Sequence, residues 1–205
     1  VFTGPIPVFD NCIFRNNVAD YSGGAVVVME SGALFIACEF TDNLAYAGGA
    51  VASYGLSSVD FIDCVFRNNS AEQGGAIDFV NAGPTTLAGC TFAGNRAPAG
   101  AHLALTFALD DTLKVDHCIL VFGGPSAAVF TDGSGAPLLA CSDIFGNEGG
   151  DWVGYLEPWA GIAGNISADP QFCNVAAGDF TIALWIKRMA ANGVNSFWVY
   201  DHQTD

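Results

Sequence analysis

The chain has 205 residues, which is enough for one domain or a short array of repeats with a buried core. It carries 21 acidic and 6 basic residues, so its net charge is −15 and it is expected to repel nucleic acid and anionic lipid surfaces. Hydrophobic residues make up 51% of the chain and charged residues 13%, which excludes a disordered acidic tail. The apolar runs are too short to span a bilayer, so we expect a packed chain with no membrane insertion and no nucleic-acid partner.

The chain begins at Val1, with neither an initiator methionine nor a basic and apolar leader, which predicts a processed product or an excised fragment. The low lysine content, the 25 glycines and the acidity are typical of secreted and surface proteins. We therefore expect an extracellular or cell-surface protein.

Cysteine recurs through the chain at a nearly fixed period. The seven cysteines are Cys12, Cys38, Cys64, Cys90, Cys118, Cys141 and Cys173. The gaps between them are 26, 26, 26, 28, 23 and 32 residues, and the first four lie in a shared pattern, Phe/Leu-x-x-Cys-x-Phe-x-x-Asn. A Gly-Gly-Ala-Val/Ile signature recurs at Gly23, Gly48 and Gly74, with a weaker copy, Gly-Ala-His-Leu, at Gly100. Such a period predicts one structural unit stacked on itself.

Each unit holds two or three short runs rich in Val, Ile, Phe and Cys, without helical periodicity. Equivalent runs are expected to pair in parallel, which predicts an all-β fold, a right-handed parallel β-helix of about six to seven coils with a period near 26 residues. The residues that mark its register are Phe9, Phe35, Phe61, Leu87, Val115 and Leu138. We expect one β-helix domain over residues 1–183 and a divergent segment, 184–205, that caps the last coil or makes an assembly contact.

The repeated residues have structural roles in such a coil. Cys and the Phe two residues later point inward, where the thiol acts as a small apolar group. The Asn three residues after the Phe is expected to bond to the equivalent amide of the next coil, and the Gly-Gly pair to form a corner. Stacked cysteines at one register give a poor disulfide torsion, so mainly reduced thiols are favoured over disulfides. After Cys118 and Cys141 the aromatic comes at the fourth residue, as Phe122 and Phe145, so the later coils are expected to be looser.

The Gly-Gly-Ala-Val/Ile and Phe-x-x-Asn signatures resemble the repeat of polymorphic outer membrane proteins, within the wider pectin-lyase-like superfamily of right-handed β-helices, over residues 9 to about 103. The stretches 141–147, 164–173 and 178–182 are similar to the closing segment of bacterial secreted β-helix repeat proteins. The resemblance implies an exported surface or adhesive module, with bacterial-type export, and it implies no reaction. The Ser-Pro-Cys expected in such closing segments is missing here, so Cys173 lacks that partner.

We expect a non-catalytic secreted or cell-surface β-helix module that acts in adhesion, glycan binding or structural assembly. Tyr21 and Tyr46 both precede a Gly-Gly corner by two residues, so they should stack on neighbouring coils. A long insertion holds further aromatic residues among Gly, Asp and Glu: Trp152, Tyr155 and Trp159. Aromatic faces beside carboxylates suit the sugar rings of polysaccharides or surface glycans. The alternative for the insertion is a lid over the helix end, and the unpaired ends near residues 2–9 and 197–200 favour self-association.

The alternative function is a polysaccharide lyase or glycoside hydrolase, because the pectin-lyase-like superfamily includes both. Such chemistry requires clustered carboxylates that hold calcium or act as an acid and base pair. The most polar stretch is the junction of the fourth and fifth coils, where the catalytic candidates are Asp110, Asp111 and His117 and a solvated turn is the simpler interpretation. The sequence lacks the Asn-x-Asp, Gly-His-Gly and Arg-x-Lys motifs of polygalacturonases.

No cofactor is expected, and calcium is the one ion that the acidic turns favour. Its candidate ligands are Asp143, Asp151, Asp169 and Asp179. The sequence has no EF-hand or Gly-Gly-x-Gly-x-Asp pattern, and its cysteines lack the close Cys or His spacing of a metal site. His102 and His117 are isolated in the sequence, so packing is the simpler role for both.

Overall fold

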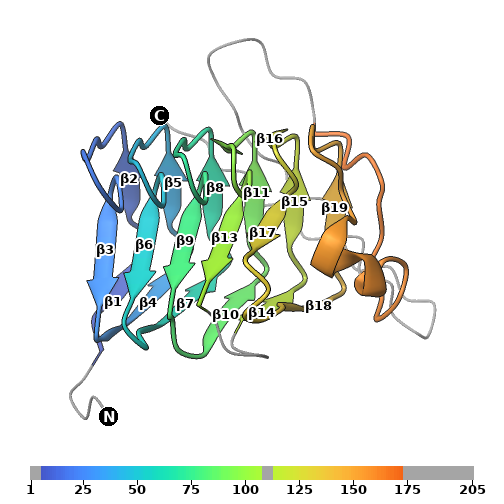
Figure 1. Ribbon diagram of the computed structural model, residues 1–205. Coiled ribbons are helices and arrows are strands. Elements are labelled where there is room, and N and C mark those ends of the chain that lie inside the picture. Colours follow the sequence, from blue (N-terminus) through green and yellow to red (C-terminus); the bar gives the residue numbers. More distant parts are fainter. Residues whose placement is uncertain (1–5, 108–112, 173–205) are drawn as a thin grey trace. The chain divides into compact units, whose positions relative to one another are not determined.

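The computed structural model describes residues 6–107 and 113–172, which form parallel β-sheets wound by successive coils (Figure 1). The first sheet contains β1 (Val8–Asp10), β4 (Gly32–Ile36), β7 (Ser58–Ile62), β10 (Thr85–Ala88), β14 (Leu113–Asp116) and β18 (Leu138–Ala140). The second contains β2 (Ile13–Arg15), β5 (Glu39–Thr41), β8 (Val65–Arg67), β11 (Thr91–Ala93), β15 (Ile119–Val121) and β19 (Asp143–Phe145). The third contains β3 (Val26–Met29), β6 (Val51–Tyr54), β9 (Ile77–Val80), β13 (Leu103–Thr106) and β17 (Val129–Thr131), and a short pair joins β12 (Arg96–Ala97) to β16 (Gly124–Pro125). The predicted all-β parallel solenoid is confirmed.

Each complete coil contributes one strand to each of the three sheets. The first two sheets have six strands and the third has five, so the described residues make five complete coils and part of a sixth. Phe9 pairs with Phe35 and Phe35 with Phe61, which confirms the step of 26 residues. Between β14 and β18 Val115 pairs with Leu139, so the expected register mark at Leu138 is wrong by one residue. Both leucines are apolar, and only the pairing decides which of them faces inward.

Two columns of stacked phenylalanine rings fill the core of the first coils. In one column, the ring centroids of Phe9 and Phe35 are 4.8 Å apart and those of Phe35 and Phe61 are 5.0 Å apart. The other column contains Phe14, Phe40, Phe66 and Phe92, with 4.7 Å between successive centroids. Rings of the two columns meet edge to face, an arrangement that aromatic pairs favour. The constant coil spacing therefore turns a repeated Phe into a continuous aromatic core.

Phe66→Leu is expected to lower the free energy of unfolding by about 1–2 kcal/mol, because leucine leaves a gap between two stacked rings and removes their contacts. Leu120 already holds the equivalent position in the fifth coil, so the variant should keep the fold. Urea denaturation followed by circular dichroism measures the change. A loss below about 0.5 kcal/mol would show that the ring column contributes little beyond ordinary apolar packing.

The inward cysteines form a column of thiols beside the phenylalanines. All six cysteines of the described residues are free thiols, and Cys173 lies outside these residues. Cys38 Sγ lies 3.3 Å from the Ile36 carbonyl oxygen and 3.4 Å from that of Phe9, to which it donates. Burial raises the pKa of Cys38 to about 11, so this thiol stays protonated and packs as an apolar group.

Cys141 lies outside this column, which corrects the expectation from the cysteine spacing. The residue in register with Cys118 is Ser142, whose Oγ accepts a hydrogen bond of 3.1 Å from the Cys118 N–H. Ser142 is buried and its hydroxyl donates to the Ala140 carbonyl at 2.9 Å, whereas Cys141 is exposed at a corner with a φ of 49°. Serine is close to cysteine in size and can bond to the backbone, so it fills the inward position and turns the Cys141 thiol outward.

The aromatic column also ends before the last coils. Leu120 pairs with Phe92 and Ile144 pairs with Leu120, so aliphatic side chains occupy the inward position. Phe122 is 45% exposed and Phe145 is half-buried, so neither ring continues the inward column, in keeping with the looser coils that the spacing predicts. The residue two after Cys118 still faces inward because side chains alternate along a strand, and Phe122 lies beyond the end of β15.

A column of asparagine amides stacks at the turn that follows the second sheet. The column contains Asn17, Asn43, Asn69 and Asn95. The Nδ2 of each of the first three donates to the Oδ1 of the next at 2.9–3.0 Å, and that Oδ1 also accepts the backbone N–H of the preceding member. The predicted bonding between amides of neighbouring coils is confirmed.

In the fifth coil a glycine replaces the asparagine of this column, and the His102 side chain occupies the space of the missing amide. Its Nδ1 lies 3.1 Å from Asn95 Nδ2, and its Nε2 lies 2.9 Å from Asn147 Oδ1. Asn147 Oδ1 also accepts the Gly123 N–H, so His102 Nε2 must carry the proton and Nδ1 must accept. A Cβ on Gly123 would lie 2.7 Å from His102 Nε2, so glycine is needed to admit the ring. Burial lowers the pKa of His102 to about 4, which keeps the ring neutral and confirms its packing role.

The insertion after β19 closes the core. Gly154–Trp159 forms a short 3₁₀ helix, η1, in which Leu156 is buried, and Trp152 and Trp159 pack against the core. This is the lid arrangement that the sequence leaves as an alternative. The compact unit that contains the coils ends at Ser167. In the described part of the chain, no helix is long and apolar enough to cross a membrane. The predicted roles of residues 184–205 fall outside the described residues.

Candidate functional site

Two exposed tyrosines lie at one corner of neighbouring coils. The Ser22–Ala47 bridge puts Tyr21 and Tyr46 at equivalent positions, and the Ala47 N–H donates to the Tyr21 carbonyl at 2.9 Å. Tyr21 is 82% exposed and Tyr46 is 59% exposed. Glu72 takes this position in the third coil, where its N–H donates to the Tyr46 carbonyl. The register therefore places two rings and then one carboxylate in a column on the surface.

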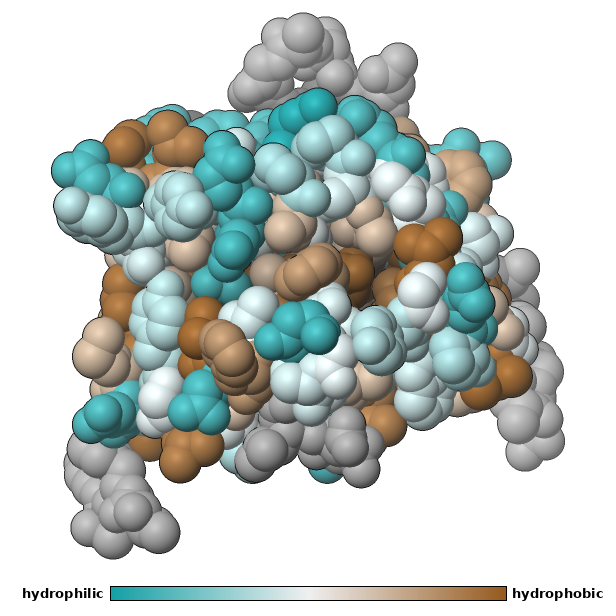
Figure 2. Space-filling model, viewed as in Figure 1, coloured by the Kyte–Doolittle hydropathy of each residue, from teal (hydrophilic) through white to brown (hydrophobic). Residues whose placement is uncertain are grey.

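Aliphatic side chains extend the tyrosine pair. Val18 and Leu44 are joined by a parallel bridge in the same two turns, and both are exposed. We call Val18, Tyr21, Leu44 and Tyr46 the tyrosine strip. Figure 2 shows apolar side chains in brown over the turns that follow β2 and β5, at the upper left of the view. Exposed apolar groups at equivalent places on two coils are typical of a binding surface.

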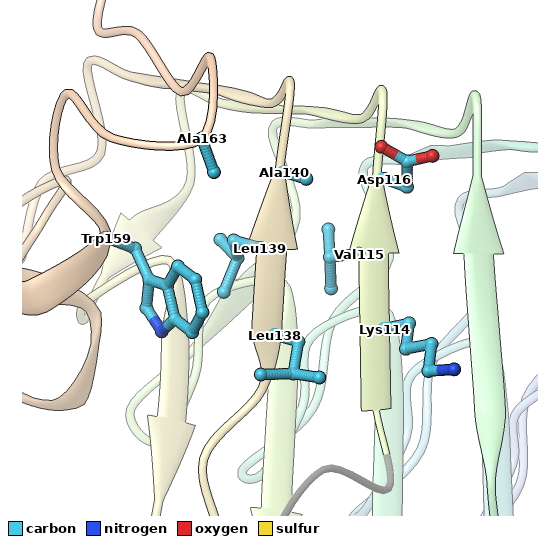
Figure 3. A pocket seen from close by; sticks show the side chains of 8 residues that line it. All are labelled: Lys114, Val115, Asp116, Leu138, Leu139, Ala140, Trp159 and Ala163. Atoms are coloured by element: carbon cyan, nitrogen blue, oxygen red, sulfur yellow. The ribbon is translucent and has the colours of Figure 1, made fainter.

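An open pocket of about 380 Å³ lies beside the last strands of the first sheet (Figure 3). It is lined by Lys114, Val115, Asp116, Leu138, Leu139, Ala140, Trp159 and Ala163. The Trp159 indole faces Leu138 and Leu139, while the Asp116 carboxylate and the Lys114 amine lie at opposite ends of β14. Trp159 therefore contributes to the core and also lines a surface that a small ligand could reach.

The insertion divides its aromatic residues between the core and the surface. Trp152 packs against the core, whereas Tyr155 is half exposed and its hydroxyl lies over Gly133. A Cβ on Gly133 would come within 2.5 Å of that hydroxyl. Of the three predicted ligand-binding residues of the insertion, Tyr155 and the pocket side of Trp159 are the ones that lie at the surface.

His117, the described member of the catalytic candidates, lies on an exposed corner. Its Nδ1 is 2.8 Å from Asp116 Oδ1, and the two side chains are 45% and 48% exposed. Cys141 follows one coil later, and one potential ligand atom from each of the three residues lies within 4.8 Å of the others. Asp110 and Asp111 lie outside the described residues. The solenoid therefore joins a carboxylate, an imidazole and a thiol that are up to 25 positions apart in the sequence.

The parallel coils and their repeated inward columns decide the family. The model of the right-handed β-helix region matches residues 4–157, which is most of the chain. This chain belongs to the right-handed β-helix family. No curated protein and no solved structure matches it.

Sequence reasoning about this right-handed β-helix missed Asp116 and Cys141 as members of one cluster. The spacing of Cys141 predicts an inward thiol, and Asp116 belongs to the polar stretch between the fourth and fifth coils. The available signal was the Asp-His pair at the end of one coil and a cysteine 24 residues after the histidine, close to one period. The one-residue shift that brings Ser142 inward is what places Cys141 at the corner.

The predicted calcium ligands of this β-helix do not assemble in the described residues. Asp151 accepts hydrogen bonds from the backbone N–H groups of Gly146 and Asn147 and from Asn147 Nδ2, so its carboxylate holds the insertion in place. Asp169 accepts the Gln171 N–H in a turn. Within residues 6–107 and 113–172, neither of these nor Asp143 belongs to a group of three potential metal ligands. Asp179 lies outside those ranges.

Proposed function

We propose that this β-helix is a non-catalytic module of the extracellular space or cell surface that binds glycans along the tyrosine strip. The observation that carries the proposal is the exposure of Tyr21 and Tyr46 at equivalent positions of adjacent coils. A tyrosine ring offers an apolar face to the C–H groups of a sugar and a hydroxyl to its polar groups. Coils rise about 4.8 Å, so the two rings can contact one extended chain together.

The charge of the chain favours neutral glycans over acidic ones. The net charge of −15 repels uronate and sulfate groups. Glu72 continues the tyrosine column, and Asp20 and Asp42 are exposed in the same two turns. Carboxylates accept hydrogen bonds from sugar hydroxyls, so they support binding of a neutral polymer beside the rings.

Titration of the protein on immobilised neutral and acidic polysaccharides tests the proposal. The wild type is expected to bind at least one neutral polymer, and the double variant Tyr21→Ala/Tyr46→Ala is expected to bind it about tenfold or more weakly, since each stacked ring contributes about 0.5–1.5 kcal/mol. Both side chains are exposed, so the variant should unfold at the same urea concentration as the wild type.

Two matched controls separate the strip from other surfaces. Ile62→Ala removes an exposed apolar side chain from β7 and is expected to leave binding unchanged. Tyr155→Ala removes the exposed ring of the insertion. A loss of binding in Tyr155→Ala with none in the double variant would overturn the assignment to the strip, and failure of the wild type to bind any neutral polymer would overturn the proposal.

A further inference from the structure

Asp116, His117 and Cys141 meet because two adjacent coils turn the same corner. The His117 N–H donates to the Ala140 carbonyl at 3.1 Å, and the Cys141 N–H donates to the Ala163 carbonyl at 2.9 Å. Both residues have left-handed backbone, with φ of 54° and 49°, so they hold equivalent positions one coil apart. Asp116 ends β14 immediately before His117. The parallel pairing of β14 with β18 therefore fixes the separation of the three side chains.

We call the residues that take the position of His117 in successive coils the corner column. Among the described coils, potential metal ligands are neighbours in this column only at His117 and Cys141. Its earlier members are Asn11, Ala37, Asp63 and Gly89. Asp63 comes two coils before His117 and its carboxylate lies over Gly89, but it does not belong to the group of three ligand atoms. Cys141 is the one described cysteine that the corner turns outward, since the other five belong to the inward column.

The three donor types fit zinc. Thiolate, imidazole and carboxylate are the ligands that Zn²⁺ takes in proteins, with distances of about 2.0–2.3 Å. The ligand atoms lie within 4.8 Å of one another, so an ion between them would be no more than about 2.8 Å from each. Side-chain rotation of exposed residues can close that difference. The exposure of Asp116 and His117 leaves the remaining coordination position to water.

We propose that Asp116, His117 and Cys141 form a zinc site that joins the fifth and sixth coils. The site has three protein ligands and one position open to water or an exogenous donor. It lies beside the pocket, because Asp116 also lines the pocket with Trp159 and Ala163. The site does not depend on the tyrosine strip, so it stands or falls separately from glycan binding.

Competition between the reduced, metal-free protein and a chromophoric chelator for Zn²⁺ tests the site. The wild type is expected to bind one equivalent, and Cys141→Ser and His117→Asn are each expected to weaken binding by at least about tenfold. Loading with Co²⁺ gives a second measurement, because a thiolate ligand produces a charge-transfer absorption that Cys141→Ser should abolish. Both changed side chains are exposed, so circular dichroism should be unaltered.

Cys12→Ser and Asp42→Asn are the matched controls, since they remove a thiol and a carboxylate from the first and second coils. Both are expected to bind Zn²⁺ as the wild type does. The proposal is overturned if the wild type takes up no Zn²⁺, if Cys141→Ser and His117→Asn bind as tightly as the wild type, or if Cys12→Ser weakens binding as much as Cys141→Ser.

Discussion

Asn69→Ala is expected to lower the free energy of unfolding by about 4 kcal/mol, because it removes four buried hydrogen bonds that each contribute about 1 kcal/mol. Asn69 Nδ2 donates to the Phe40 carbonyl at 2.9 Å and to Asn95 Oδ1 at 3.0 Å. Its Oδ1 accepts from the Asn43 N–H at 3.0 Å and from Asn43 Nδ2 at 2.9 Å. Alanine supplies none of these partners, and no water reaches a residue that is fully buried. Urea denaturation of the variant and the wild type measures the loss.

Asn17→Ala is the matched control at the exposed end of the same column. Asn17 Nδ2 donates one hydrogen bond, to Asn43 Oδ1, and the side chain is in contact with water. The control is expected to cost about 1 kcal/mol. Equal losses in the two variants would contradict the account, because the effect would then not depend on burial within the column.

Asp78→Asn is expected to raise the free energy of unfolding by about 4 kcal/mol at pH 8 and to have little effect at pH 4. Asp78 is 1% exposed on the outer side of β9, and neither carboxyl oxygen has a hydrogen-bond partner. Burial raises the pKa of Asp78 to about 7. Asparagine has the same shape and cannot ionise, so the variant removes only the cost of the charge.

The sign of this pH dependence follows from the difference between the Asp78 pKa values of the native and unfolded states. The unfolded chain loses the Asp78 proton near pH 3.9 and the native protein near pH 7, so the wild type loses stability as the pH rises between these values. Three pKa units correspond to about 4 kcal/mol. His102 acts in the opposite direction: its native pKa of about 4 lies below the unfolded value near 6.5, so its contribution is complete above pH 6.5 and is lost as the pH falls towards 4.

Denaturation of the wild type and Asp78→Asn at a series of pH values measures the difference between them. Asp42→Asn, at an exposed turn, is the control and is expected to change the free energy of unfolding by less than about 0.5 kcal/mol. A constant difference between wild type and Asp78→Asn from pH 4 to pH 8 would show that Asp78 does not carry a buried proton.

The fold was predictable because the repeat appears in the sequence as both a period and a pattern. Cys, Phe and Asn keep fixed spacings through four coils, and each spacing corresponds to one inward or turn position. The pattern failed between the fifth and sixth coils, where the step shortens to 24 residues and Ser142 replaces cysteine in the column. Serine and cysteine have nearly the same shape, so either can fill the inward position. A pattern that follows cysteine alone therefore misses a coil in which serine takes this position.

The site residues were less predictable because contacts between coils depend on register to a single residue. The equivalent positions of Tyr21 and Tyr46 on neighbouring coils follow from the Gly-Gly signature that both precede, and the Ser22–Ala47 bridge puts them there. The cluster of Asp116, His117 and Cys141 could not be predicted in this way, because it forms only where a cysteine departs from the repeated pattern. Likewise, nothing in the spacing indicated that His102 would fill the gap above Gly123, because that contact joins a turn of one coil to the amide column of the next.

The proposal that the tyrosine strip makes this β-helix a glycan-binding module without catalysis can be tested by two measurements on one sample. The protein is incubated with a neutral polysaccharide that it retains, and both bound protein and newly formed reducing ends are determined. We expect retention that depends on Tyr21 and Tyr46, with no increase in reducing ends over hours at high protein concentration. An increase in reducing ends, or retention that is unchanged in Tyr21→Ala/Tyr46→Ala, would contradict it.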